Sequence, residues 1–68
     1  MYFRRLREDM DMNQTQIAEI LDTSQTVYSR YERGYRTIAI EHLLILADFY
    51  DVSADYILDR TNNPKTNH

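Results

Sequence analysis

The segment from 25 to 33 carries side chains that can form specific hydrogen bonds with the edges of nucleic-acid bases. Gln25, Thr26, Ser29 and Arg30 recur at spacings of three and four residues, so on a helix they share one face. Glutamine pairs bidentately with adenine and arginine with guanine, while threonine can meet the methyl group of thymine. Exposed polar residues on a helix are most often merely solvated, so the surrounding sequence must decide between these two interpretations.

Positive charge is concentrated in the half of the chain that contains this segment. The net charge is −3, which argues against a protein that coats nucleic acid by charge alone. Residues 1–36 nevertheless hold six arginines and six acids, whereas residues 37–68 hold two basic and five acidic residues. The six arginines are Arg4, Arg5, Arg7, Arg30, Arg33 and Arg36. This distribution favours local contacts with phosphate, although Arg4 and Arg5 are expected to be ordinary surface charges.

Two short helices joined by a tight turn are predicted between 13 and 34. The signals in chain order are an N-cap at Asn13, its capping-box partner Gln16, a stop at Asp22, a second N-cap at Ser24 and a terminating glycine at Gly34. The second of these helices is predicted for 25–33. The residues expected to face inward are Ile17, Ala18, Leu21, Tyr28 and Tyr31. The free backbone amides at the two helix starts, beside Gln14 and Ser24, suit phosphate oxygens.

Three further helices are predicted around this unit. The first covers 2–10, and its apolar residues are Tyr2, Phe3, Leu6 and Met10. The fourth covers 40–50, and its predicted inner face is Ile40, Leu43, Leu46, Ala47 and Tyr50. Ser53 is the expected cap of a short fifth helix over 54–59. The fold class is therefore all-α, a compact five-helix domain over 1–60 that is followed by a polar, flexible tail over 61–68.

Several classes of protein are disfavoured by what the sequence lacks. It contains no cysteine, so disulfides and cysteine-based zinc sites are excluded. His42 and His68 have no partner at metal-ligand spacing, and no acid pair, nucleophile or glycine-rich phosphate loop points to catalysis. No apolar run approaches 18 residues, and no signal-peptide pattern is present. The expectation is a cytoplasmic, soluble protein that is not an enzyme and needs no cofactor or metal.

An ordered set of residues resembles the Cro and lambda-repressor class of helix-turn-helix regulators, often called Xre-type. The resemblance covers about residues 3–58. It is carried by Leu6, Arg7, Met12, Asn13, Gln14, Ile17, Ala18, Ser24, Gln25, the run 29–34, Leu43, Leu46, Ala47, Val52, Ser53, Ile57 and Leu58. Three positions depart from the family pattern: Asp22 replaces the usual turn glycine, Tyr28 an aliphatic core residue, and Ala39 a capping serine.

The resemblance implies a role for each matching position. Base contacts in the major groove would come from Gln25, Thr26, Ser29 and Arg30. Phosphate contacts would come from Asn13, Gln14, Ser24, Arg33, Tyr35 and Arg36. Arg7 and Glu32 would form a partly buried ion pair between the first and third helices. The implied function is sequence-specific binding of double-stranded DNA by a transcriptional regulator, a repressor acting by occupancy, without a small-molecule effector.

Apolar residues outside the predicted core leave a second question open. Ile38, Ile45 and Phe49 fall off the main face of the fourth helix, and Tyr56 is a further candidate for exposure. Such residues often mark association. One interpretation is a homodimer through the C-terminal helices, including Tyr56 and Ile57, on an inverted-repeat operator. The alternative is a protein-interaction or antitoxin-like module on the same scaffold, which would use Ile38, Ile45 and Phe49.

Overall fold

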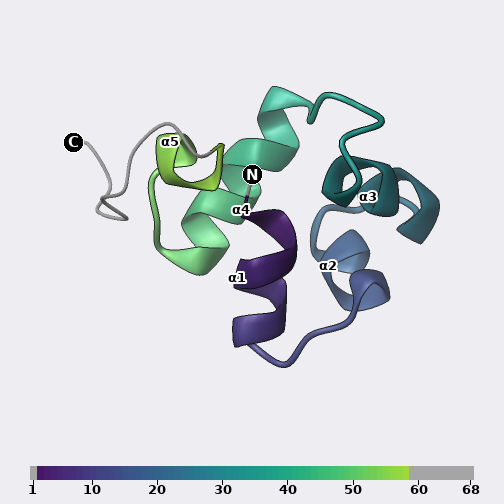
Figure 1. Ribbon diagram of the computed structural model, residues 1–68, viewed down its shortest axis with the longest axis horizontal. Coiled ribbons are helices and arrows are strands. Elements are labelled where there is room, and N and C mark those ends of the chain that lie inside the picture. The colour runs from purple at the N-terminus through teal and green to yellow at the C-terminus, as the bar shows by residue number, and fades with distance from the viewer. Residues whose placement is uncertain (1, 59–68) are drawn as a thin grey trace.

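Five helices make up the part of the chain, residues 2–58, that the computed structural model describes (Figure 1). They are α1 (Phe3–Asp9), α2 (Gln14–Ile20), α3 (Gln25–Glu32), α4 (Ile40–Tyr50) and α5 (Ala54–Ile57). No strand occurs within these residues, so the predicted all-α class is confirmed. α2 and α3 pack together on one side, α5 lies against α4 on the other, and α1 touches α3 between them. The tail predicted for 61–68, and His68 in it, lie outside the described residues.

The helix starts are fixed by the capping residues that the sequence predicts. At α2, the Asn13 side chain accepts from the Gln16 backbone N–H at 2.8 Å, and the Asn13 N–H donates to the Gln16 side chain at 2.9 Å. The Ser24 hydroxyl accepts from the third residue of α3 at 3.2 Å, and the Ser53 hydroxyl accepts from the third residue of α5 at 3.0 Å. Ala39 provides no such bond to α4, as its side chain requires.

Three aspartates hold left-handed backbone conformations at helix ends. Asp11, Asp22 and Asp51 have φ of 55°, 55° and 56°, and they follow α1, α2 and α4 respectively. Gly34, after α3, has φ of 76°. The left-handed conformation costs a residue with a Cβ free energy that glycine does not lose. Asp22, which stands where the family pattern has glycine, therefore holds the strained conformation, and the same conformation recurs at two turns where it was not predicted.

Replacing Asp22 with glycine should stabilise the protein. The change relieves the left-handed strain and removes a negative charge from the C-terminal end of α2, for a gain of about 1 kcal/mol in unfolding free energy. Urea denaturation followed by circular dichroism measures this gain. Glu19→Gly, an exposed change inside α2, is the control and should instead cost about 1 kcal/mol. A loss of stability in Asp22→Gly would show that the aspartate makes a compensating contact.

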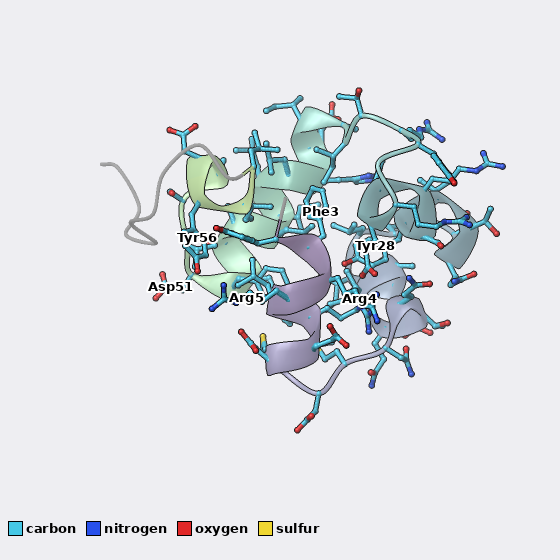
Figure 2. All side chains as sticks on the ribbon, viewed as in Figure 1. Phe3, Arg4, Arg5, Tyr28, Asp51 and Tyr56 are labelled. Carbon is cyan, nitrogen blue, oxygen red and sulfur yellow. The ribbon has the colours of Figure 1, made fainter. Side chains whose placement is uncertain are left out.

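The core lies where α1, α3 and α4 meet. Phe3 and Tyr28 point into its centre (Figure 2). The buried apolar residues are Phe3, Ile17, Ala18, Leu21, Tyr28, Tyr31, Leu43, Leu46, Val52 and Ile57. The backbone N–H of Tyr2 donates to the carbonyl of Ile57 at 2.9 Å, which joins the start of α1 to the end of α5. The five residues predicted to face inward from the two-helix unit are all in this core.

Several apolar residues do not lie where they were predicted to lie, among them Tyr56, which is partly buried against the core. Met10 is exposed, because it is the C-cap of α1 and the chain turns away directly after it. Ile40, the first residue of α4, is also exposed. The buried side of α4 is formed by Leu43 and Leu46, and Ile40 does not lie on that side. Ile38 was predicted to lie outside the core but packs against it. Ile57 was a dimer candidate but is fully buried in the core.

Candidate nucleic-acid interface

The two-helix unit is held together by apolar contacts between α2 and α3. Ile17, Ala18 and Leu21 of the first half and Tyr28 and Tyr31 of the second are almost inaccessible to solvent. Ala18 is small, which lets the two helices approach closely. Tyr28 and Tyr31 meet edge to face, with ring centroids 6.5 Å apart. Burial of these inner faces leaves the opposite side of α3 directed outward.

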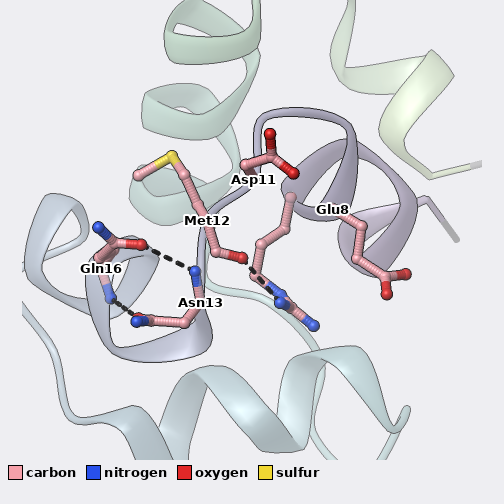
Figure 3. A pocket seen from close by; sticks show the side chains of 6 residues that line it. Glu8, Asp11, Met12, Asn13 and Gln16 are labelled. Atoms are coloured by element: carbon pink, nitrogen blue, oxygen red, sulfur yellow. Dashed lines mark hydrogen bonds between the residues drawn. The ribbon is translucent and has the colours of Figure 1, made fainter.

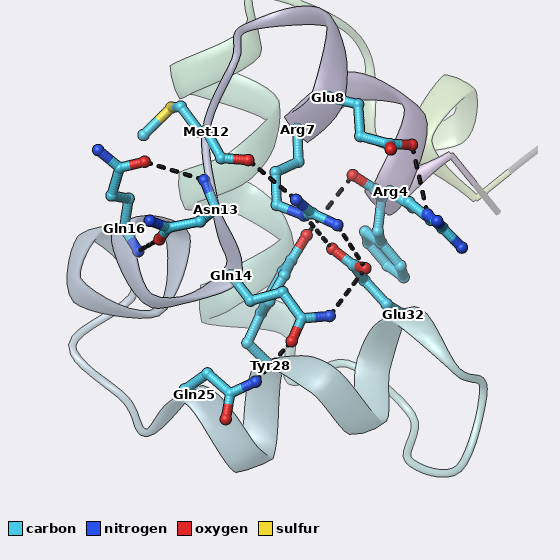
Figure 4. Close-up of polar contacts among 11 residues, drawn as sticks. Arg4, Arg7, Glu8, Met12, Asn13, Gln14, Gln16, Gln25, Tyr28 and Glu32 are labelled. Atoms are coloured by element: carbon cyan, nitrogen blue, oxygen red, sulfur yellow. Dashed lines mark hydrogen bonds and ion pairs between the residues drawn. The ribbon is translucent and has the colours of Figure 1, made fainter.

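A buried ion pair fixes α3 to α1. The Arg7 Nε donates to Glu32 Oε2 at 2.6 Å, and Nη2 donates to Oε1 at 3.2 Å (Figure 4). The Arg7 side chain is 14% exposed and that of Glu32 only 5%. Arg7 also donates from Nη1 to the Met12 carbonyl at 2.9 Å, which ties it to the chain leading into α2. The pair that the family resemblance implied is therefore present, in a bidentate geometry.

Two glutamines extend this pair to the outer surface. Gln14 donates its side-chain amide to Glu32 Oε1 at 3.1 Å, and its own oxygen accepts from the amide of Gln25 at 2.5 Å (Figure 4). Because an ionised carboxylate only accepts hydrogen bonds, Glu32 fixes which end of the Gln14 amide is nitrogen. Gln14 in turn fixes the amide of Gln25. The Gln25 oxygen and its second N–H remain available at the exposed start of α3.

Electrostatics favour the ionised form of Glu32. Burial alone would raise the pKa of Glu32, but hydrogen bonds from Arg7 and Gln14 outweigh it and hold this pKa below its ordinary value. Burial raises the pKa of Tyr28, whose hydroxyl donates to the Phe3 carbonyl at 3.5 Å, and burial raises the pKa of Tyr50 to about 12. Both hydroxyls therefore stay protonated. The Tyr50 hydroxyl is buried and has no hydrogen-bond partner among the described residues.

The depressed pKa of Glu32 gives stability a defined pH dependence. A carboxyl whose pKa is lower in the folded state stabilises the fold above its unfolded pKa, near 4.3 for a typical glutamate, and the benefit is lost as pH falls through the folded value. The difference in unfolding free energy between the wild type and Glu32→Gln should therefore shrink as the solution is acidified from neutral pH to below about 4. Denaturation series at several pH values measure this difference. A constant difference would contradict it.

The candidate contact residues gather on the outer side of α3 and on its two flanking turns. Gln25, Thr26 and Arg30 are exposed, and Ser29 is half-buried. Arg33, Tyr35 and Arg36 are exposed directly after α3, where the Arg33 guanidinium lies 5.1 Å from the centroid of the Tyr35 ring. Asn13 and Ser24 are also exposed, and Gln14 is half-buried. The predicted set thus lies at the start of α2, along α3 and in the connection after it, and contacts join Gln14 to Gln25 and Arg33 to Tyr35.

The contact between Gln14 and Gln25 was not predicted. The resemblance assigned Gln14 to phosphate and Gln25 to a base, without a bond between them. Their amides meet because α2 and α3 both begin near the same point of the surface, eleven residues apart in sequence. Among local signals, the only pointer was that each glutamine directly follows an N-cap residue.

Two other polar features have structural roles. A hollow of about 400 Å³ lies beside the connection between α1 and α2, lined by Arg7, Glu8, Asp11, Met12, Asn13 and Gln16 (Figure 3). Several residues that line this hollow form hydrogen bonds with one another. Arg7 donates to the Met12 carbonyl, and Asn13 bonds to Gln16. His42 meets the Tyr31 hydroxyl at 2.9 Å, joining α4 to α3. Within residues 2–58, no three His, Cys, Asp or Glu side chains are grouped as metal ligands would be.

Comparison with known proteins assigns the chain to a family. Residues 3–57 match the sequence model described as helix-turn-helix. The chain belongs to the helix-turn-helix family. This confirms the resemblance that was seen in the ordered residue set. No solved structure is significantly similar to the chain.

Three curated relatives of the chain are proteins of Bacillus subtilis. The uncharacterized HTH-type transcriptional regulator YobD is 38% identical over 61 residues, which are 90% of this chain and 54% of YobD. The HTH-type transcriptional regulator AnsR is 33% identical over 61 residues, 90% of this chain and 53% of AnsR. The regulator ImmR is 34% identical over 64 residues, 94% of this chain and 50% of ImmR. The chain therefore spans about half the length of these relatives.

The helices of this domain are short. The longest one, α4, has 11 residues. Within the described part of the chain, none is long and apolar enough to span a bilayer.

Proposed function

We propose that the protein is a sequence-specific DNA-binding transcriptional regulator that inserts α3 into the major groove. The observation that carries the proposal is the outer face of α3, where Gln25, Thr26 and Arg30 are exposed while the side behind them is anchored to the core. The names of the relatives describe the same class of protein. Ser29, beside these residues, would add a shorter hydroxyl contact.

Phosphate contacts would hold α3 in register on the duplex. Asn13, Gln14 and Ser24 stand at the starts of α2 and α3, where free backbone N–H groups attract anions. Arg33, Tyr35 and Arg36 would contact the backbone beyond the other end of α3. Three arginines on and after α3 supply positive charge at this surface although the whole chain has a net charge of −3.

The regulator would act by occupancy, as a repressor in the cytoplasm, and without catalysis. We propose a homodimer on an inverted repeat, with the two recognition helices about 34 Å apart, one turn of DNA. Because Ile57 is buried in the core, α5 would contribute Tyr56 and its neighbours to the dimer contact without Ile57.

Salt dependence of duplex binding tests the proposal. Fluorescence anisotropy with labelled random-sequence and selected duplexes should show affinity that falls steeply between about 50 and 200 mM salt, because each neutralised phosphate releases counterions. The selected duplex should bind at least about a thousandfold more tightly than the random one. Absence of duplex binding, or affinity that ignores salt, would contradict the proposed function.

A further inference from the structure

The outward side of α4 carries apolar side chains that the described part of the fold leaves uncovered. Ile40 is 61% exposed, Leu44 57%, Ile45 39% and Phe49 36%. Four large apolar side chains on one side of a single 11-residue helix are unusual in a small soluble domain, and such patches mark association sites. None of the four belongs to α2 or α3, the helices that carry the candidate DNA-reading residues.

Two acids divide this surface into ribs. At about 100° per residue, Ile40 and Leu44 form one rib of α4, and Ile45 and Phe49 form another. Glu41 and Asp48, both exposed, lie between the ribs. They are seven residues apart, so they sit on one line along the helix at a separation of about 10 Å. The surface is therefore an apolar strip with a negative line along its middle.

This charge pattern argues against a second copy of the chain as the occupant. In an antiparallel two-fold pairing of α4 helices, Glu41 of one copy would face Asp48 of the other, twice. In a parallel pairing, each acid would face its own equivalent. Like charges opposed across an interface are strongly unfavourable, so neither arrangement is self-complementary.

The C-terminal residues of the chain and negatively charged surfaces are also poorly suited to cover this apolar strip. Residues 59–68 contain no leucine, isoleucine, valine, methionine, phenylalanine or tyrosine, so their sequence offers nothing that could cover the ribs. Nucleic acid and anionic lipid surfaces carry negative charge and would be repelled by Glu41 and Asp48.

We infer that this surface of α4 docks an amphipathic helix of another protein, one that carries two basic residues about two turns apart between rows of aliphatic side chains. The basic residues would pair with Glu41 and Asp48, while the aliphatic rows would cover the two ribs. In this mode of recognition one helix packs on another, and the pairs formed by Glu41 and Asp48 fix the position of the docked helix along α4. The inference does not depend on DNA binding, since it uses no residue of the two-helix unit.

A designed peptide pair tests the inference on the full chain. One peptide is a helix with leucine rows on both sides of two lysines that are seven residues apart, and its match has glutamates in place of the lysines. NMR titration should show the lysine peptide shifting amides of α4, with much weaker binding of the glutamate peptide. The chain variant Glu41→Lys with Asp48→Lys should reverse this preference, weakening the lysine peptide at least about tenfold. Glu19→Lys, which changes an exposed acid on α2, is the control and should leave the preference unchanged.

Three outcomes would overturn the inference. The peptides could bind equally, or they could shift amides away from α4. The chain alone could also show concentration-dependent shifts on α4 that Leu44→Lys abolishes, in which case the surface belongs to a homodimer.

Discussion

Glu32→Ala should lower the free energy of unfolding by about 3 kcal/mol, because the change leaves the Arg7 guanidinium without its carboxylate in a mostly buried position. It also removes the acceptor that orients Gln14. For a domain of this size, the loss corresponds to a fall in melting temperature of about 15 °C. Thermal denaturation followed by circular dichroism measures it.

An exposed ion pair in the same chain provides the matched control. Arg4 and Glu8 approach to 3.3 Å along α1, but their side chains are 73% and 55% exposed. Solvent screens such a pair, so Glu8→Ala should change the unfolding free energy by no more than about 0.5 kcal/mol. Equal melting temperatures for Glu32→Ala and Glu8→Ala would mean that burial gives the Arg7–Glu32 pair no special role.

Features set by near neighbours in sequence were predictable. Asn13, Ser24 and Ser53 each cap a helix as expected, because capping joins a side chain to a backbone amide only three residues away. Asp22 is different, because it stood out through the family resemblance, which has glycine at this turn, and it does hold positive φ. The helices and their order followed from these signals together with apolar periodicity.

Features that depend on tertiary packing were not predictable from pattern. Periodicity shows that a helix has an apolar face, but it does not show which apolar stripe is buried. The sequence of α4 has enough apolar residues to form two such stripes. Ile40 was therefore placed inside and Leu44 was overlooked, while both are exposed. The contact from Gln14 to Gln25 needs α2 and α3 in their packed positions, and the Arg7–Glu32 pair was available only through the family resemblance.

The second large effect concerns sequence preference. If α3 reads bases as proposed, Arg30→Ala should remove discrimination at one base-pair position of each half-site, at a cost of about 1–3 kcal/mol for the preferred duplex. Arg30 is exposed, so its removal should leave stability nearly unchanged. Selection of bound duplexes from random DNA, followed by sequencing, should show one position per half-site becoming degenerate while the others keep their preference.

Arg36 supplies the contrasting variant that separates reading from anchoring. It is exposed in the connection after α3, where a phosphate contact carries no sequence information. Arg36→Ala should therefore weaken all duplexes alike and lower the magnitude of the salt slope by about 1, with the selected sequence unchanged. If both variants weakened binding uniformly, α3 would be holding the backbone without reading it. If only Arg36→Ala altered the selected sequence, the reading surface would lie in the turn after α3. The pair of variants thus decides whether the polar face of α3 specifies the DNA sequence or only adds affinity.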